Sequence, residues 1–172
     1  MTAHQPYTVI SSFDDFEVRN YPESAIAELT VEGSFEQAGT RAFGALAGYI
    51  NGRNRGGRSI AMTAPVLQGS DTGRSHAIAF VLPADLTVHD APTPTDARVS
   101  VKAVPATTTA ALRYTGRWTE ESYSRHRAKL LAAVAREGLL PVGEPRFARY
   151  NPPFTPWFLR RNEVLVDVAR TE

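Results

Sequence analysis

The stretch "GSFEQAGTRAFGALAGYING" at residues 33–52 decides the fold, because it predicts a helix between strands and the second half of the chain has the same order of elements. Ser34, followed three positions later by Gln37, forms a capping box that is typical of a helix start. Apolar residues then recur at helical spacing, and Gly52 follows the last of them. We therefore predict an amphipathic helix over residues 35–50 that covers a sheet with one face.

A second amphipathic helix is predicted from about Thr119 to Gly138. Glu120 and Glu121 stand in its first turn, where the helix dipole favours acidic side chains. Apolar residues again recur at helical spacing, so this helix also packs on the rest of the protein with one face only.

The rest of the chain is predicted to form strands. These are residues 16–21, 25–31, 77–82, 98–104, 107–114, 146–150 and 164–168. The apolar stretch "SIAMTAPV" at residues 59–66 is too apolar for a surface turn, yet Pro65 has no donor for the ladder of an ordinary central strand.

The order of strands and helices occurs twice. Gly33-Ser34-Phe35 precedes the first helix as Gly116-Arg117-Trp118 precedes the second, roughly 85 residues later. We predict two ββαββ halves, at about 7–89 and 98–169, linked by the proline-rich stretch at 90–97. Since each half is small for a stable core, residues 1–172 should form one α+β domain. Its architecture would be one curved sheet or a distorted barrel that both halves share.

Composition limits the partners. The chain has 19 Lys and Arg against 18 Asp and Glu, so its net charge of +1 creates no overall attraction to nucleic acid or an anionic membrane, and neither partner is expected. Without cysteine there is no disulfide or thiolate site. No leader is recognised and no apolar run approaches the roughly 20 residues of a membrane span, so a soluble cytoplasmic protein is expected.

Two features of the sequence could carry chemistry. The stretch "GRNRGGRS" at residues 52–59 has phosphate-loop spacing with Arg58 in place of lysine, but it follows a helix instead of preceding one. It is interpreted as a solvated loop or as a contact for an anionic ligand. No two of the four histidines have the i, i+4 spacing of a helical metal site, which leaves His126 as a weak metal candidate or a histidine hydrogen-bonded at the core boundary. No motif argues for an enzyme.

The closing stretch "ARYNPPFTPWFLRRNEVLVDV" at residues 148–168 concentrates aromatic residues among prolines and leads into Arg160-Arg161. One interpretation is that the aromatic residues seal the end of a barrel while the arginines pair with acids. The other is an apolar surface with guanidinium groups at its edge, which suits a planar aromatic molecule that carries carboxylates.

Five stretches together resemble the SOUL family of haem-binding proteins, over about residues 7–168. They are "FEVRNYP", "AFGALAGYINGRN", "IAMTAPV", "FVLP" and "RYNPPFTPWFLRRNEV". The resemblance implies a distorted antiparallel β-barrel of two pseudo-symmetric ββαββ halves with two outer helices, similar to effector-binding domains that accept bulky, flat ligands. It also implies that "IAMTAPV" is a barrel strand in which Pro65 ends regular pairing. It also implies non-covalent binding of haem or another tetrapyrrole as a carrier or buffer.

The ligand-binding candidates come from the first helix, the arginine loop, the following strand and the closing stretch. They are Phe43, Leu46, Ile50, Arg55, Arg58, Met62, Tyr150, Phe154, Trp157, Arg160 and Arg161. Some family members have a proposed iron-binding histidine where this chain has Asn20, and a proposed propionate-binding lysine falls near Thr155, so no bis-histidine haem site is expected. Arg160 and Arg161 should contribute more than the loop arginines, because the loop contains three glycines and would lose more backbone entropy on binding.

Two alternatives stay open. The chain could be an effector-sensing or protein-interaction module for another flat hydrophobic ligand. It could also be a haem-using enzyme, which would need an axial ligand and a distal pocket open to oxygen.

Overall fold

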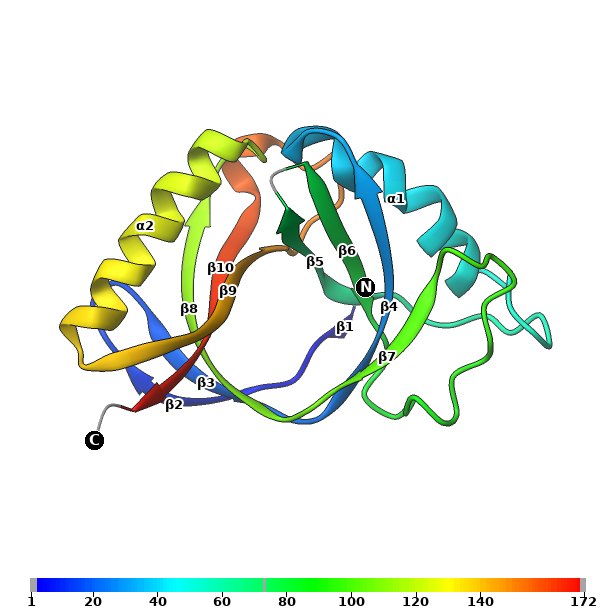
Figure 1. Cartoon of the computed structure of the whole chain (residues 1–172), viewed down its shortest axis with the longest axis horizontal. Helices are drawn as coiled ribbons and strands as arrows, with labels where there is room; N and C mark the ends of the chain where they lie inside the picture. Colours follow the sequence, from blue (N-terminus) through cyan, green and yellow to red (C-terminus); the bar gives the residue numbers. More distant parts are fainter. Residues whose placement is uncertain (1–2, 73, 171–172) are drawn as a thin grey trace. The chain divides into compact units, whose positions relative to one another are not determined.

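The computed structural model describes residues 3–72 and 74–170, which form two compact units. The first unit consists of Met1–Pro6 and Glu23–Pro105, and the second of Tyr7–Pro22 and Ala106–Glu172. Each unit contains one long helix and an antiparallel sheet (Figure 1).

The first unit contains the helix that the opening stretch predicts. Its elements are β1 (Ala3–His4), β4 (Ser24–Glu32), α1 (Phe35–Ile50), β5 (Thr63–Thr72), β6 (Ser75–Val81) and β7 (Ser100–Val104). The strands lie in the order β7-β4-β6-β5 with antiparallel pairing, and β1 pairs in parallel with β5.

The second unit has a related plan. Its elements are β2 (Thr8–Ser12), β3 (Glu17–Tyr21), β8 (Thr107–Thr115), α2 (Glu120–Arg136), β9 (Leu139–Arg149), the 3₁₀ helix η1 (Trp157–Leu159) and β10 (Arg161–Arg170). The strand order is β2-β3-β8-β10-β9, and every pair is antiparallel.

The order of strands and α-helices contains β3-β4-α1-β5-β6 followed by β7-β8-α2-β9-β10. The first strand of each run belongs to the unit that contains the rest of the other run. β3 pairs with β8, for example Arg19 with Thr109, and β7 pairs with β4, for example Ala25 with Ala103. The compact units therefore differ from the sequence halves at 7–89 and 98–169. The α+β class and antiparallel pairing are confirmed, while the sheet within each unit is open and forms no closed barrel.

Both helices begin as their caps predict. The Ser34 hydroxyl accepts a hydrogen bond from the Gln37 amide, and the Thr119 hydroxyl accepts one from the Ser122 amide, each 3.2 Å long. α1 packs on β4 and β6, and α2 packs mainly on β9 and β8. Burial of the apolar faces supplies most of the stability of the two helices. Leu46 in the first unit and Leu130 in the second are fully buried.

The stretch "IAMTAPV" leads into β5, and the peptide bond before Pro65 is cis. The pairing of β5 with β6 is irregular between Thr63 and Val66 and then continues to Thr72, so Pro65 interrupts the regular pairing and does not end it. Among the described residues, no helix has the length and apolar character needed to cross a membrane.

Candidate ligand-binding surfaces

The outer face of α1 carries a flat apolar strip. Phe43 is 52% exposed, Gly44 is exposed, and Ala47 and Gly48 are partly exposed one turn later. A Cβ atom placed on Gly44 would meet no atom within 4 Å, so the backbone there lies open. The Phe43 ring contacts Phe80 edge-on at 5.9 Å between centroids, which fixes one border. We call Phe43, Gly44, Ala47 and Gly48 the α1 strip.

A guanidinium group lies at the end of this strip. The Arg53 side chain extends over Gly48, so that a Cβ atom placed there would lie 2.9 Å from Arg53 Cδ and 3.4 Å from Nη1. Arg53 is exposed, and a planar ligand on the strip would find one cation beside it.

The loop that carries Arg53 is held in place by Asn54, a buried residue that the sequence did not single out. Its Nδ2 donates to the carbonyls of Tyr49 and Arg58 at 2.8 Å, and its Oδ1 accepts from the Arg58 amide at 2.9 Å. An internal side chain therefore holds this loop in place of a backbone ladder. Arg55 and Arg58 are exposed, and Arg58 also donates to the Asp90 carbonyl at 3.1 Å.

Three other candidates of this unit lie elsewhere. Leu46 and Ile50 point into the hydrophobic core, and Met62 is partly buried against the same core cluster. The apolar periodicity of α1 identifies the face that packs on the sheet, whereas the α1 strip lies on the other side of the helix. Of the helix candidates, only Phe43 is available to a ligand on that surface.

In the second unit, Arg160 and Arg161 use their donors within the protein. Arg160 donates from Nε to the Thr155 carbonyl at 3.0 Å and from Nη2 to the Pro153 carbonyl at 2.8 Å. Arg161 donates from Nη2 to the Glu163 carboxylate at 3.0 Å, and its guanidinium lies 4.0 Å from the centroid of the Tyr150 ring. Both arginines therefore hold the closing segment, which we define as residues 150–161.

Tyr150 belongs to the same internal network. Its hydroxyl donates to the Glu163 carboxylate at 2.7 Å. Burial raises the pKa of Tyr150, and the negative charge of Glu163 raises it further. Tyr150 thus remains protonated at neutral pH and acts as a donor inside the unit.

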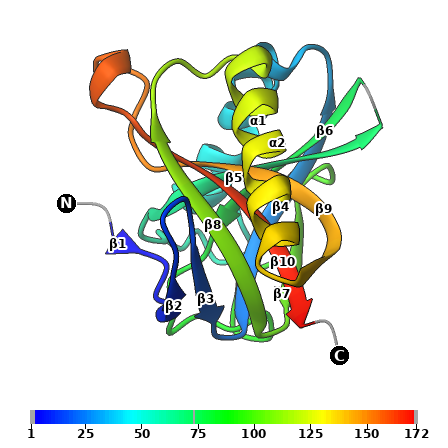
Figure 2. The same ribbon diagram turned by 90° about the vertical axis from the view of Figure 1, so that its left-hand side faces the viewer.

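The closing segment exposes a second aromatic surface. Phe154 is 87% exposed, and Trp157, Phe158 and Leu159 are about half exposed. Figure 2 shows η1 in orange, projecting just before the start of β10. Arg117 lies over the Trp157 ring at 4.6 Å.

Trp118 contacts residues at the end of the closing segment. The Arg160 guanidinium lies 4.0 Å from the Trp118 ring centroid, and the indole Nε1 donates to the Asn162 side chain at 2.8 Å. Sequence reasoning missed both Arg117 and Trp118 as contacts of the closing segment, although they belong to the repeated Gly116-Arg117-Trp118 motif.

His126 lies at the boundary of the core. Its Nδ1 is 2.7 Å from the Ser122 carbonyl, and its ring stacks on Tyr114 at 3.8 Å between centroids. Burial lowers the pKa of His126, and the positive charges of Arg125 and Lys129 lower it further. No group of three or more His, Cys, Asp or Glu in the described ranges could hold a metal ion.

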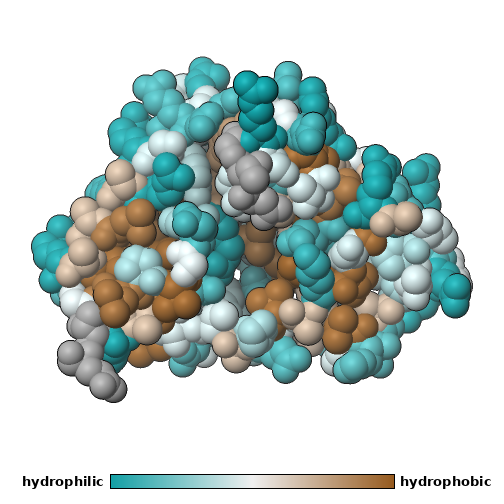
Figure 3. Space-filling model, viewed as in Figure 1, coloured by the Kyte–Doolittle hydropathy of each residue, from teal (hydrophilic) through white to brown (hydrophobic). Residues whose placement is uncertain are grey.

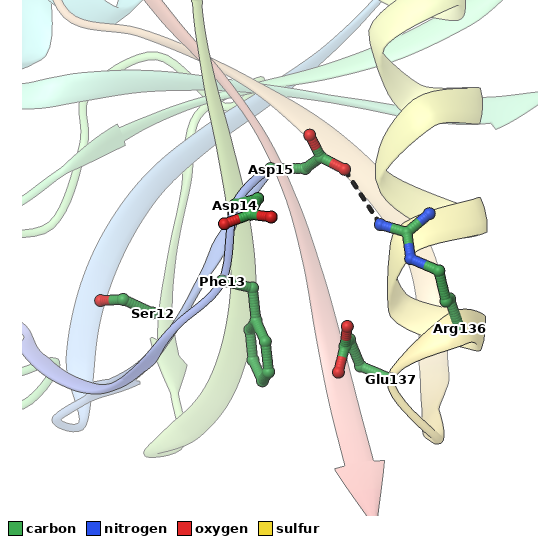
Figure 4. Close-up of a pocket in the computed structure, with 6 residues that line it drawn as sticks. All are labelled: Ser12, Phe13, Asp14, Asp15, Arg136 and Glu137. Carbon is green, nitrogen blue, oxygen red and sulfur yellow. Dashed lines mark hydrogen bonds and ion pairs between the residues drawn. The ribbon is translucent and has the colours of Figure 1, made fainter.

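A surface pocket of about 510 Å³ lies between the β2–β3 turn and the end of α2 (Figure 4). It is lined by Ser12, Phe13, Asp14, Asp15, Arg136 and Glu137. The single arginine already pairs with Asp15 at 3.0 Å, and carboxylates dominate the remaining lining. The pocket therefore does not suit an apolar molecule that carries carboxylates.

Comparison with known proteins identifies relatives in sequence and in fold. A family model described as SOUL heme-binding protein matches residues 2–167, while no curated protein matches the chain significantly. The solved structure of the EcmrR C-terminal domain is similar with a TM-score of 0.70 and 12% identity, covering 96% of this chain and 99% of that one. A hydrolase from Listeria innocua is similar with a TM-score of 0.65 and 12% identity, covering 93% and 94%.

A further solved structure, SAV2435 bound to tetraphenylphosphonium, has a TM-score of 0.51 and 9% identity, covering 90% of this chain and 94% of that one. At these identities the likeness concerns the fold. It confirms the predicted α+β architecture of the effector-binding-domain type.

Proposed function

Because the chain belongs to the SOUL haem-binding protein family, we propose that it binds haem or another tetrapyrrole without a covalent bond, on the α1 strip. The observation that carries this proposal is the flat outer face of α1, bordered by Phe43 and ended by Arg53. A tetrapyrrole is planar and apolar with carboxylates at its edge, so its face would cover the strip while a carboxylate contacts the guanidinium.

The α1 strip can contact the flat face of a tetrapyrrole, but it cannot bind the iron of haem. Phe43, Gly44, Ala47 and Gly48 provide no side chain that can bind iron. Binding would rest on buried apolar area and on Arg53, with Arg55 and Arg58 available on the ordered loop. We therefore expect similar affinities for haemin and for iron-free protoporphyrin, as in a carrier or buffer.

A sensing role is the second candidate. SAV2435, which shares the fold, was solved with tetraphenylphosphonium, a bulky aromatic cation. In this chain, Arg53 lies over Gly48 of the α1 strip and Arg117 lies over the exposed Trp157 ring, and these cations favour anionic ligands. A sensor of this kind would change its affinity for a protein partner when the flat ligand binds.

The test is a titration of the chain with haemin and with protoporphyrin, following absorbance and tryptophan fluorescence. Gly44→Leu fills the open surface and should weaken both affinities at least about tenfold, which corresponds to about 1.4 kcal/mol. Gly44→Ala adds one methyl group, and Ala132→Leu adds an exposed leucine on α2, so both serve as controls. Unchanged binding by Gly44→Leu would exclude the α1 strip, and absence of binding by the unmodified chain would exclude the function.

A further inference from the structure

Arg149 has an unusual environment in the second unit. Its guanidinium makes no hydrogen bond and no ion pair with any residue among those described, and it contacts only the rings of Trp118 at 5.0 Å and Phe147 at 5.9 Å. Burial, together with the nearby charge of Arg160, lowers the pKa of Arg149 to about 10. A guanidinium carries five donors, and leaving them without acceptors in a partly buried place is costly.

Two further arginines also lie over tryptophan rings of this unit. Arg160 lies over Trp118 and Arg117 lies over Trp157, and none of the ion pairs between described residues involves Arg117, Arg149 or Arg160. We call these three residues the arginine cluster. Like charges held together without an acid favour the binding of an anion from outside.

Apolar side chains accompany the cluster on the closing segment. Phe154, Phe158 and Leu159 are all more than half exposed, and three prolines limit the freedom of the backbone that presents them. Such residues gain free energy by leaving water, and aromatic residues beside arginines suit the boundary between polar headgroups and acyl chains. A small hydrophilic anion would leave these apolar residues in water.

We propose that the arginine cluster binds the phosphate or carboxylate headgroup of an anionic lipid, whose acyl chains contact Phe154, Phe158 and Leu159. The guanidinium groups of Arg149 and Arg117 have free donors for a bidentate contact with such a group. The overall charge of +1 does not oppose this, because interactions with an anionic surface act over about a Debye length and depend on local charge. The proposal concerns the second unit and is independent of tetrapyrrole binding on the α1 strip.

The experiment uses the full chain with vesicles of phosphatidylcholine, with and without phosphatidic acid, and measures sedimentation and tryptophan fluorescence. Binding should require phosphatidic acid and should be accompanied by a blue shift of the emission, since Trp157 lies beside the lipid-binding residues. A second arm uses a short-chain phosphatidic acid below its micelle concentration, which distinguishes binding of single lipids from binding of a bilayer. A third arm uses inorganic phosphate, which should bind much more weakly than either lipid.

Arg149→Gln should reduce binding about fivefold, the effect of one basic residue at an anionic surface, and Phe158→Ser should reduce it by a similar factor. The matched controls are Arg113→Gln and Val142→Ser, which alter an exposed arginine on β8 and an exposed valine on β9. Figure 3 shows apolar surface over the side of the second unit that carries α2 and β9, so Val142→Ser tests whether any exposed apolar residue has the same effect.

Because Phe158 is exposed, Phe158→Ser should remain folded even if Arg149→Gln is destabilised. Equal loss in the controls, equal binding to neutral vesicles, or binding of inorganic phosphate as tight as that of the lipids would overturn the proposal. So would a loss of haemin affinity in Arg149→Gln with lipid binding unchanged, because the cluster would then serve the tetrapyrrole.

Discussion

The carboxylate of Glu163 accepts two parallel hydrogen bonds from the guanidinium of Arg19, each 2.7 Å long, and the two side chains are 0% and 2% exposed. Arg161 and Tyr150 complete the environment of Glu163, as described above, and Arg19 also pairs with Glu17 at 2.7 Å. This charged core belongs to the second unit and joins β3 to β10. Because Glu163 also accepts hydrogen bonds from Tyr150 and Arg161, the same core holds both ends of the closing segment.

Replacing Glu163 by Gln should destabilise the protein by about 3–5 kcal/mol, because Arg19 would keep its charge in the core and lose its fully buried counterion, with only the partly exposed Glu17 left beside it. Unfolding by urea, followed by circular dichroism, measures this. Asp167→Asn is the control, since Asp167 on the same strand pairs with Arg146 at 3.2 Å and is about one-third exposed. Its loss should cost at most about 1 kcal/mol. Equal effects of the two substitutions would contradict the buried role of Glu163.

The same pair predicts how stability depends on pH. Burial alone would raise the pKa of Glu163, but the hydrogen bonds and charge of Arg19 outweigh it and the pKa lies below its ordinary value of 4.5. The unfolded chain therefore binds a proton at higher pH than the folded chain. The stabilisation is complete above about pH 4.5 and is lost as the pH falls through the folded pKa. Urea unfolding on both sides of this range should show a decline that is smaller in Glu163→Gln.

Local patterns predicted much of this fold. The first helix was predicted at residues 35–50 and occupies Phe35–Ile50, because its cap and its apolar face both act within a few residues. β2 and the first half of β9 were missed, since both are largely exposed and lack apolar alternation. The exchange of first strands between the units depends on pairing between distant segments, which no local pattern records.

The candidate surfaces were harder to predict for a related reason. Periodicity marks the residues that pack in the core, such as Leu46 and Ile50, whereas the α1 strip consists largely of small residues that leave no hydrophobic signal. The hydrogen bond from Arg161 to Glu163 agrees with one of the two interpretations of the closing stretch, in which its arginines pair with acids. Asn54 orders the arginine loop through three hydrogen bonds that cannot be read from a stretch rich in glycine.

Asn54→Ala tests that loop directly. The substitution leaves the carbonyls of Tyr49 and Arg58 and the Arg58 amide without a partner, which should cost about 1–3 kcal/mol. Tetrapyrrole affinity should also fall, because Arg53 would lose its ordered backbone. Thr95→Ala is the control, as it removes one exposed hydrogen bond to the Arg53 carbonyl and should cost at most about 1 kcal/mol. An unchanged melting temperature in Asn54→Ala would disagree with the structure.

Substitution of Arg160 and substitution of Arg161 should lower stability by different amounts. Arg161→Gln removes a charged hydrogen bond to Glu163 and should lower stability by about 1.5–3 kcal/mol. Arg160→Gln removes contacts to the Thr155 and Pro153 carbonyls and should mainly loosen the closing segment, with a smaller loss of stability. Neither should change haemin affinity if the ligand lies on the α1 strip. A selective loss of haemin affinity in either variant would instead place a carboxylate of the ligand at that arginine.

His126 offers the clearest test of whether iron takes part in binding. Its Nδ1 faces the Ser122 carbonyl at 2.7 Å, and its lowered pKa makes the ring neutral at pH 7, so Nδ1 donates and Nε2 carries the lone pair. A neutral ring of this tautomer could bind iron, yet His126 belongs to α2 of the second unit while the α1 strip belongs to the first. We expect His126→Ala to leave both haemin affinity and the haem absorption spectrum unchanged, and to lower stability through the lost stacking on Tyr114. His89→Ala, at an exposed position, is the control for stability. Loss of an axial-ligand signal in His126→Ala alone would show that iron binds at α2 and would move the tetrapyrrole away from the α1 strip.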